Sequence, residues 1–213
     1  LKIISGMRKL TFLIFTFIIL TGINVGKAQT ALPYSINFAD SQEGWTAVDE
    51  SSIPGNTWTY MPKWAYIQGK YYGSIVLKMD YSSASNDYYI SPDFSLEAGK
   101  TYAAEFNICS QSDGNANTVS FEYGTSNSDM TAFSKLSDVT LNDNSEYPAA
   151  QKVEIKVNEN GKYYFAFHCT SQQFNGTVLL FEFKLYEEGG SVIDPPDEPI
   201  VSIPYHVDLT TDY

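Results

Sequence analysis

The stretch from residue 151 to residue 170, QKVEIKVNENGKYYFAFHCT, decides the fold class of this chain. In its first half, three valine or isoleucine residues alternate with charged residues, which is the period-two pattern of a strand with one buried face. Asn158-Glu159-Asn160-Gly161 then interrupts the pattern with residues that favour turns. Lys162 to Thr170 follow as a second run of strand-forming residues. The stretch therefore predicts β-structure on both sides of a turn.

Strands of the same kind recur through the chain, and no segment shows the periodicity of an amphipathic helix. Clusters of Gly, Asn, Asp and Ser separate the strands, as in Ser112-Asp113-Gly114-Asn115. Short strands that alternate with such turns at regular spacing are typical of an all-β, two-sheet sandwich. The other expected strands cover residues 35–38, 74–79, 87–90, 101–109, 118–123 and 177–186.

The composition excludes two broad classes of protein. The 213 residues include 13 basic and 25 acidic ones, so the formal net charge is −12. A nucleic-acid-binding protein needs clustered Lys and Arg, and Arg8 is the only arginine, so no nucleic-acid partner is expected. Hydrophobic residues make up 43% of the chain and aromatic residues 15%, which predicts a sizeable packed core rather than a disordered chain.

Residues 1–28 are predicted to be a signal peptide with a short upstream extension. Met7-Arg8-Lys9 is a basic start, Leu10 to Ile23 form an almost wholly apolar run, and Gly26-Lys27-Ala28 offers small residues for cleavage after the alanine. The apolar run has about 14 residues, short of the ~20 that span a bilayer, which favours a cleaved signal over an uncleaved anchor helix. We therefore expect a secreted or cell-surface protein that meets the membrane only through the signal peptide.

The end of the sequence suggests a second copy of the domain. Residues 187–201 are rich in Gly, Pro and acidic residues, a composition that predicts a flexible linker. Beyond it, residues 202–209, SIPYHVDL, match residues 31–38, ALPYSINF, in residue class at each position. We expect residues 202–213 to be the truncated start of a second repeat, with a chance similarity as the alternative. The domain at 31–186 would then be the first of tandem repeats.

Four stretches of the predicted domain carry a resemblance to a known family. They are Leu32-Pro33-Tyr34 to Phe38, Glu43-Gly44-Trp45-Thr46, Tyr89 to Leu96, and Gly161 to His168. In this order and spacing they resemble the cleaved-adhesin or choice-of-anchor J family of Bacteroidetes surface proteins. The resemblance implies an antiparallel jelly-roll sandwich, a module found in secreted adhesins and beside secreted peptidases.

Aromatic residues in the loop-rich region 43–73 are candidates for ligand binding. Rings that project from loops can form a platform on which sugars stack. The alternative, which we favour, is that these rings fill the core of the sandwich, as most aromatic side chains of a sandwich do. The candidate residues are Trp45, Trp58, Trp64, Tyr71 and Tyr72.

Calcium is the one cofactor for which the sequence offers ligands. Asp40, Glu43, Asp49 and Glu50 cluster early in the domain, and carboxylate oxygens are what Ca²⁺ prefers. The resemblance also implies a structural calcium. The chain departs from the family pattern, however, because Glu182 is the only acid where the final strand usually carries a pair of Asp residues. A solvated acidic loop is the alternative.

No catalytic constellation stands out, and we predict that the chain is not an enzyme. The chain has two histidines, His168 and His206, and lacks both the Gly-x-Ser-x-Gly and the His-Glu-x-x-His motifs. His168 lies in a strand-like run and is expected to be a sheet-surface or hydrogen-bonded core residue. Pairs of carboxylates of the glycosidase kind stay open at this point, because a sequence gives no distances between them.

The two cysteines are expected to stay unpaired. Cys109 and Cys169 each lie towards the end of a long strand, so they could meet if those strands were neighbours. By strand parity, however, Cys109 shares a face with polar residues, whereas Cys169 shares one with Phe165 and Phe167. Opposite faces would keep the thiols too far apart for a disulfide.

Together these patterns predict a secreted binding or adhesion module of the cell surface, which binds an extracellular protein or a glycan. One alternative is a carbohydrate-binding or accessory module of a secreted peptidase or glycosidase. Another is a structural spacer without a ligand. Fold-level resemblance supports adhesion only by association.

Overall fold

The computed structural model describes residues 30–78, 83–111 and 114–189. The expected signal peptide, the expected second repeat and all but the first residues of the expected linker lie outside these ranges. Within them the chain forms twelve strands and one short 3-10 turn, and no helix there is long and apolar enough to cross a membrane. The elements are β1 (Tyr34–Asn37), β2 (Thr46–Asp49), β3 (Thr59–Ile67), β4 (Lys70–Leu77), β5 (Asp87–Ile90), β6 (Phe94–Leu96), β7 (Tyr102–Gln111), β8 (Val119–Gly124), η1 (Met130–Ala132), β9 (Ser134–Asp138), β10 (Gln151–Ile155), β11 (Gly161–Cys169) and β12 (Thr177–Glu187).

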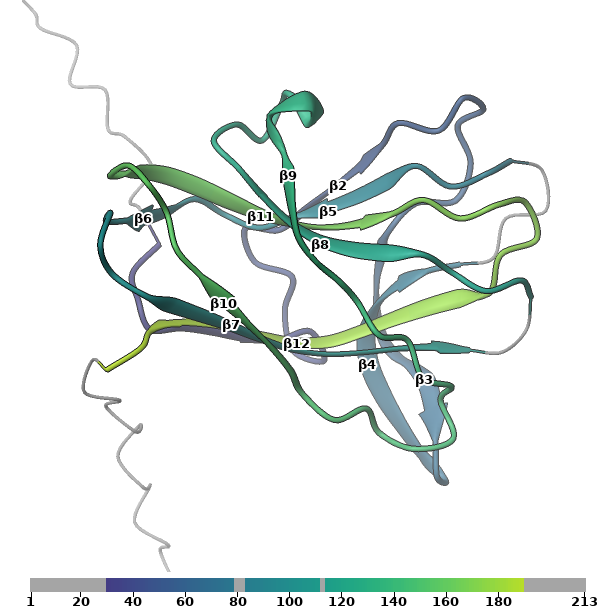
Figure 1. Ribbon diagram of the computed structural model, residues 1–213. Helices are drawn as coiled ribbons and strands as arrows, with labels where there is room; N and C mark the ends of the chain where they lie inside the picture. Colours follow the sequence, from purple (N-terminus) through teal and green to yellow (C-terminus); the bar gives the residue numbers. More distant parts are fainter. Residues whose placement is uncertain (1–29, 79–82, 112–113, 190–213) are drawn as a thin grey trace, which may run out of the picture.

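The strands form two antiparallel sheets that pack face to face, which confirms the predicted all-β sandwich and is consistent with a jelly roll (Figure 1). One sheet has the order β10-β7-β12-β4-β3, and β1 also pairs with β12. The other has the order β2-β5-β11-β8-β9, and β6 also pairs with β11. β10 and β11, the two strands of residues 151–170, belong to different sheets. The turn between them therefore takes the chain from one layer to the other.

Side chains from the inner faces of the two sheets fill one aromatic core. Phe106 of β7 lies 5.1 Å from Phe121 of β8 and 5.0 Å from Phe167 of β11, measured between ring centroids. Each of these rings is at most 1% exposed. Burial of a phenylalanine side chain contributes about 1.5–3 kcal/mol, so this cluster is a main source of stability.

The alternation that predicted β10 is confirmed by its burial. Ile155 and Val157 are buried in the core, whereas Glu154 and Lys156 are exposed and form an ion pair at 2.6 Å. Gly161 differs from the expectation for a turn residue, because it opens β11, paired with Leu96, and has no positive φ.

The region 43–73, expected to be rich in loops, contains β2, β3 and the start of β4. β3 was not predicted from the sequence. Pro62 lies within it, and a proline in a strand-like run argues against a strand because it cannot donate a hydrogen bond to a neighbouring strand. The structure accommodates this proline in a β-bulge, where Pro62, Lys63 and Trp64 together lie opposite the single residue Gly73. A bulge bends a strand and increases its twist, so β3 curves at this point.

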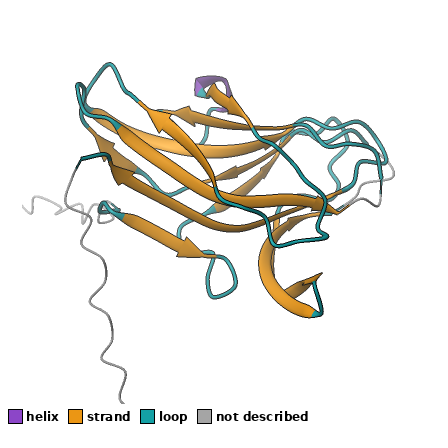
Figure 2. Cartoon of the chain, turned by 60° about the horizontal axis from the view of Figure 1, so that its bottom comes forward, coloured by secondary structure: helices purple, strands orange, loops and turns teal. Residues whose placement is uncertain are grey.

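The hairpin made by β3 and β4 projects from the sandwich. The reason is that β4 and β1 pair with different parts of the same edge of β12. β4 pairs with residues 178–180 of β12, whereas β1 pairs with residues 182–185. The part of β4 before Ile75 therefore has only β3 as a partner. Figures 1 and 2 show the resulting hairpin as a curved arm that projects from the layers.

A close backbone contact holds the arm at its base. Gly73 of β4 packs on the loop after β1, so that a Cβ atom at this position would lie 2.5 Å from the Cα atom of Ala39. The hydroxyl of Tyr60 on β3 donates a hydrogen bond to the carbonyl oxygen of Ala39 at 3.3 Å. The arm is thus fixed to the loop that follows β1.

Candidate functional site

A hollow of about 640 Å³ lies between the projecting arm and the sheet. We call it the hairpin groove. Three segments distant in sequence contribute most of its lining: the loop after β1, the arm itself and the middle of β12. The lining residues that bear on its chemistry are Asp40, Lys63, Lys70, Tyr71, Tyr72, Tyr147 and Glu182.

Two β-bulges meet at the hairpin groove. One is the bulge in β3 that contains Lys63, and the other lies in β12, where Phe181 is the extra residue between the pairs made by Leu180 and Glu182. A bulge places successive side chains on one face of a strand, and both Phe181 and Glu182 line the groove. Bulges that re-aim side chains in this way are over-represented next to functional sites.

Aromatic rings form one wall of the groove. Tyr72 lies 5.0 Å from Tyr147 and 6.1 Å from Phe181, between ring centroids, and Tyr147 lies 5.1 Å from Phe181. Burial, with the charge of Glu182 adding to it, raises the pKa of Tyr147 far above its usual value. Tyr147 therefore keeps its proton, and its hydroxyl donates to Oε1 of Glu182 at 3.3 Å.

The tip of the arm carries an exposed pair of tyrosines. Tyr66 and Tyr71 face each other across the hairpin, with ring centroids 4.9 Å apart, and are 56% and 62% exposed. Gln68 and Gly69 connect the two strands in a two-residue turn in which both residues have positive φ. Such a turn matches the twist of a hairpin and so fixes the register that brings the two rings together.

The five aromatic candidates from the sequence fall into two groups. Trp45 and Trp58 are 5% and 3% exposed and pack in the core, as the favoured interpretation predicted. Their buried rings cannot stack on a sugar. Trp64 is half-buried against the outer face of the β12 sheet. Only Tyr71 and Tyr72 line the hairpin groove.

Sequence reasoning missed four residues of this site: Lys63, Tyr66, Lys70 and Tyr147. A signal existed for two of them, because Lys70 directly follows Gln68-Gly69 and Tyr66 stands two residues before this pair, which is a form of the turn signature of a tight hairpin. No local pattern marks Tyr147, which reaches the groove from the long loop between β9 and β10.

The structure does not gather the predicted calcium ligands. Asp40 lines the hairpin groove and also, with Glu43, a second hollow of about 590 Å³ beside β1. Asp49 uses both carboxylate oxygens to accept backbone N–H groups of the following loop, at 2.9 and 3.1 Å, and Glu182 accepts a tyrosine hydroxyl. Asp40 and Glu182 both line the hairpin groove, whereas Glu43, Asp49 and Glu50 do not, and the described residues hold no group of three or more side chains suited to a metal.

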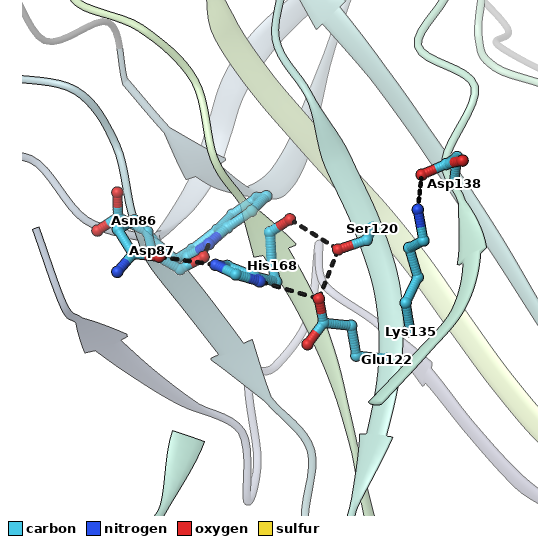
Figure 3. A network of polar contacts seen from close by, with 8 residues as sticks. Asn86, Asp87, Ser120, Glu122, Lys135, Asp138 and His168 are labelled. Carbon is cyan, nitrogen blue, oxygen red and sulfur yellow. Dashed lines mark hydrogen bonds and ion pairs between the residues drawn. The ribbon is translucent and has the colours of Figure 1, made fainter. Parts of the chain in front are cut away.

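The outer face of the other sheet carries a polar network around His168 (Figure 3). Nδ1 of His168 lies 2.9 Å from Oε1 of Glu122, and Nε2 lies 2.8 Å from Oδ1 of Asn86. The side-chain amide of Asn86 donates to a backbone carbonyl, so its oxygen is the atom that faces the ring. Both ring nitrogens therefore have a hydrogen-bond partner. The expectation of a hydrogen-bonded histidine is confirmed.

This network lacks the arrangement of a serine hydrolase, although it contains a serine, a histidine and an acid. In such an enzyme the serine hydroxyl bonds to the histidine, which takes its proton. Here the Ser120 hydroxyl donates instead to Glu122 at 2.6 Å, so the histidine has no hydroxyl to activate. Tyr88 also covers the ring of His168 in a stacked contact with centroids 3.8 Å apart.

The network predicts that the stability of the domain depends on pH. Burial acts to raise the pKa of Glu122, but hydrogen bonds from His168 and Ser120 outweigh it and lower that pKa below its usual value. Because folding favours the carboxylate, this stabilisation is present above the unfolded pKa of Glu122 and is lost as the pH falls through the lowered folded value. Glu122→Gln is expected to reduce the loss of stability that occurs as the pH falls below the ordinary glutamate pKa.

The measurement is urea unfolding at a series of pH values, with Glu154→Gln as a matched control. Glu154 is an exposed acid that pairs with Lys156 at the surface. A pH dependence identical in the wild type and in both variants would show that Glu122 does not contribute to acid sensitivity.

The cysteines are unpaired and buried, as strand parity predicted. Cys109 lies on the outer face of its sheet, whereas Cys169 lies in the core between the sheets. Burial is the main cause that raises the pKa of each thiol to about 12, so both thiols keep their protons near neutral pH.

Comparison with solved structures finds the same fold in the K1, K2 and K3 cleaved adhesin domains of Lys-gingipain. The K1 domain, from Porphyromonas gingivalis, has a TM-score of 0.53 and 14% identity over 75% of this chain and 100% of its own. The K2 domain has a TM-score of 0.52 and 15% identity, with coverage of 71% and 98%. The K3 domain, also from P. gingivalis, has a TM-score of 0.52 and 14% identity, with coverage of 72% and 98%.

No family model matches the sequence, and no curated protein matches it. At identities of 14–15%, the likeness to the Lys-gingipain domains establishes a shared sandwich fold. The fold implied by the resemblance in the sequence is thus confirmed, while membership of the cleaved-adhesin family stays a prediction.

Proposed function

We propose that this chain is an extracellular binding module and that it binds a glycan in the hairpin groove. The observation that carries the proposal is the exposed Tyr66–Tyr71 pair beside a groove lined by aromatic and hydrogen-bonding side chains. A sugar ring has apolar C–H faces and a rim of hydroxyl groups. Aromatic rings suit the faces, and a few placed donors and acceptors suit the rim.

The polar lining of the groove offers both donors and acceptors. Lys63 and Lys70 donate hydrogen bonds, whereas Asp40 and Glu182 accept them. Tyrosines supply a large contact area with only two side-chain torsions to immobilise, which keeps the entropic cost of binding low. Loops and arms held by a rigid sandwich are also the usual place for such sites.

In this proposal the module acts by binding rather than by catalysis. Within the described residues, the one contact between a serine, a histidine and an acid is arranged as a structural network. The predicted export signal and second repeat would make the module the first of several in a secreted surface protein. An accessory role beside a secreted peptidase or glycosidase is compatible with the same groove.

Tyr71→Ala is expected to weaken binding to the recognised glycan by about tenfold, because a few aromatic residues commonly carry most of the binding energy of a contact. Affinity gel electrophoresis of the full chain against a panel of neutral and acidic polysaccharides identifies the ligand and measures the loss. Phe174→Ala is the matched control, since Phe174 is 50% exposed and lies outside the groove lining.

Retention of full affinity by Tyr71→Ala would reject the hairpin groove as the site. A chain that binds no polysaccharide in the panel would reject the proposal that the module binds a glycan.

A further inference from the structure

We infer that the groove is built for an anionic glycan whose sugars carry carboxylate groups, and that Lys63 and Lys70 bind those groups. This inference rests on the proposed function, because it names the class of glycan that the same groove would hold. The lysines of the groove differ from most other lysines of the described residues in forming no ion pair.

Lysines elsewhere in the described residues are mostly paired. Five of them form ion pairs with Asp or Glu, at 3.3 Å or less. Lys63 and Lys70 lie in the groove lining, are exposed, and have no acidic group within 4 Å among the described residues. On a chain of net charge −12, two unpaired cations in one hollow form a local exception. Their charge is available to a ligand.

The backbone also directs Lys63 to the groove at a conformational cost. Its φ is 64°, in the left-handed region that side-chain-bearing residues rarely adopt. The bulge that imposes this conformation also lets Lys63 line the groove opposite the edge of β12. Residues held in sparsely populated conformations tend to cluster at binding sites, where the surrounding structure supports them.

Lys70 is placed beside the aromatic wall. Its ammonium group lies 4.8 Å from the centroid of the Tyr72 ring, so the charge would lie next to a sugar that rests on the wall made by Tyr72, Tyr147 and Phe181. An anionic group on that sugar would meet the ammonium at its edge. A sugar with a carboxylate on its ring thus matches both features at once.

The acids of the groove favour carboxylated sugars over densely sulfated ones. Asp40 and Glu182 accept hydrogen bonds from hydroxyl groups, which a uronic acid retains beside its carboxylate. These two acids also repel additional negative charge, so a ligand with several charges on each sugar is disfavoured.

The test compares two probes with the same backbone, an oligogalacturonate and its fully methyl-esterified form. We expect the full chain to bind the acid at least tenfold more tightly than the ester, because esterification removes the charge and keeps the sugar. Lys63→Gln and Lys70→Gln are each expected to weaken binding of the acid by about threefold to fivefold, and to weaken binding of the ester by a smaller factor, because glutamine keeps a hydrogen-bond donor but no charge.

Lys184→Gln is the matched control, because Lys184 is exposed, forms no ion pair and lies outside the groove. Equal affinity for acid and ester, with a loss in Tyr71→Ala, would overturn the charge inference and keep the proposed function. Equal losses in Lys184→Gln and in the groove variants would also overturn it. Tighter binding of dextran sulfate than of oligogalacturonate would contradict the carboxylate assignment. Binding of no glycan, acidic or neutral, would reject the proposed function itself.

Discussion

Trp45→Ala is expected to destabilise the domain by about 3–5 kcal/mol, the range for removal of a fully buried large aromatic side chain. The ring of Trp45 is 5% exposed and packs between the sheets. It stacks on Tyr89 and meets Phe38 and Phe183 edge to face, with centroids 5.0–5.4 Å apart. Its Nε1 group also donates to the hydroxyl of Tyr34 at 3.0 Å, so the variant loses a hydrogen bond as well.

Urea unfolding measures this loss, with Trp64→Ala as the control. Trp64 is half-buried on the outer face, so its removal leaves a smaller cavity and is expected to cost less. Glycan affinity measured on the same variants distinguishes a role in core packing from a role in binding. Loss of glycan affinity in Trp45→Ala without loss of stability would mean that Trp45 contacts the ligand and that its burial is misassigned.

Gly73→Ala is expected to destabilise the domain by about 1–3 kcal/mol and to disturb the groove. A Cβ atom at this position would approach the Cα of Ala39 to 2.5 Å, and the nearest atoms are mainly backbone, which cannot rotate away as a side chain can. The arm must therefore move relative to the loop after β1. Because both segments line the groove, glycan affinity is expected to fall together with stability.

Gly161→Ala is the matched control for this substitution. Gly161 also lies at the start of a strand pairing, but a Cβ atom there would meet its nearest neighbour at 3.7 Å, an ordinary contact. We expect a change of stability below about 1 kcal/mol and unchanged affinity. Equal melting temperatures for Gly73→Ala and Gly161→Ala would show that the arm is not held by the backbone contact at Ala39.

The fold class could be predicted because strand periodicity is a local property. Each strand that buries one face repeats its pattern every two residues, as Val153 to Val157 do. Pairing between strands is not local, and β10 and β11 illustrate this, since they follow each other in sequence yet belong to different sheets. A bulge, such as the one in β3, also interrupts the two-residue alternation by which a strand is recognised in the sequence.

The candidate site was predicted only in part, for a related reason. Tyr71 and Tyr72 were identified as aromatic residues in a region rich in turns, but Trp45 and Trp58 have the same signal and lie in the core. Burial depends on which sheet face a strand presents, and this is set by tertiary pairing. The groove itself depends on the shared edge of β12, which no local sequence pattern specifies.

NMR mapping of backbone amides distinguishes ligand binding in the hairpin groove from binding elsewhere on the domain. Oligogalacturonate is titrated into the isotopically labelled chain, and shifts are followed residue by residue. We expect the largest shifts in the arm, residues 61–73, and in its two neighbours at 39–40 and 181–182. Saturable shifts confined to other loops, or to the face around His168, would contradict it.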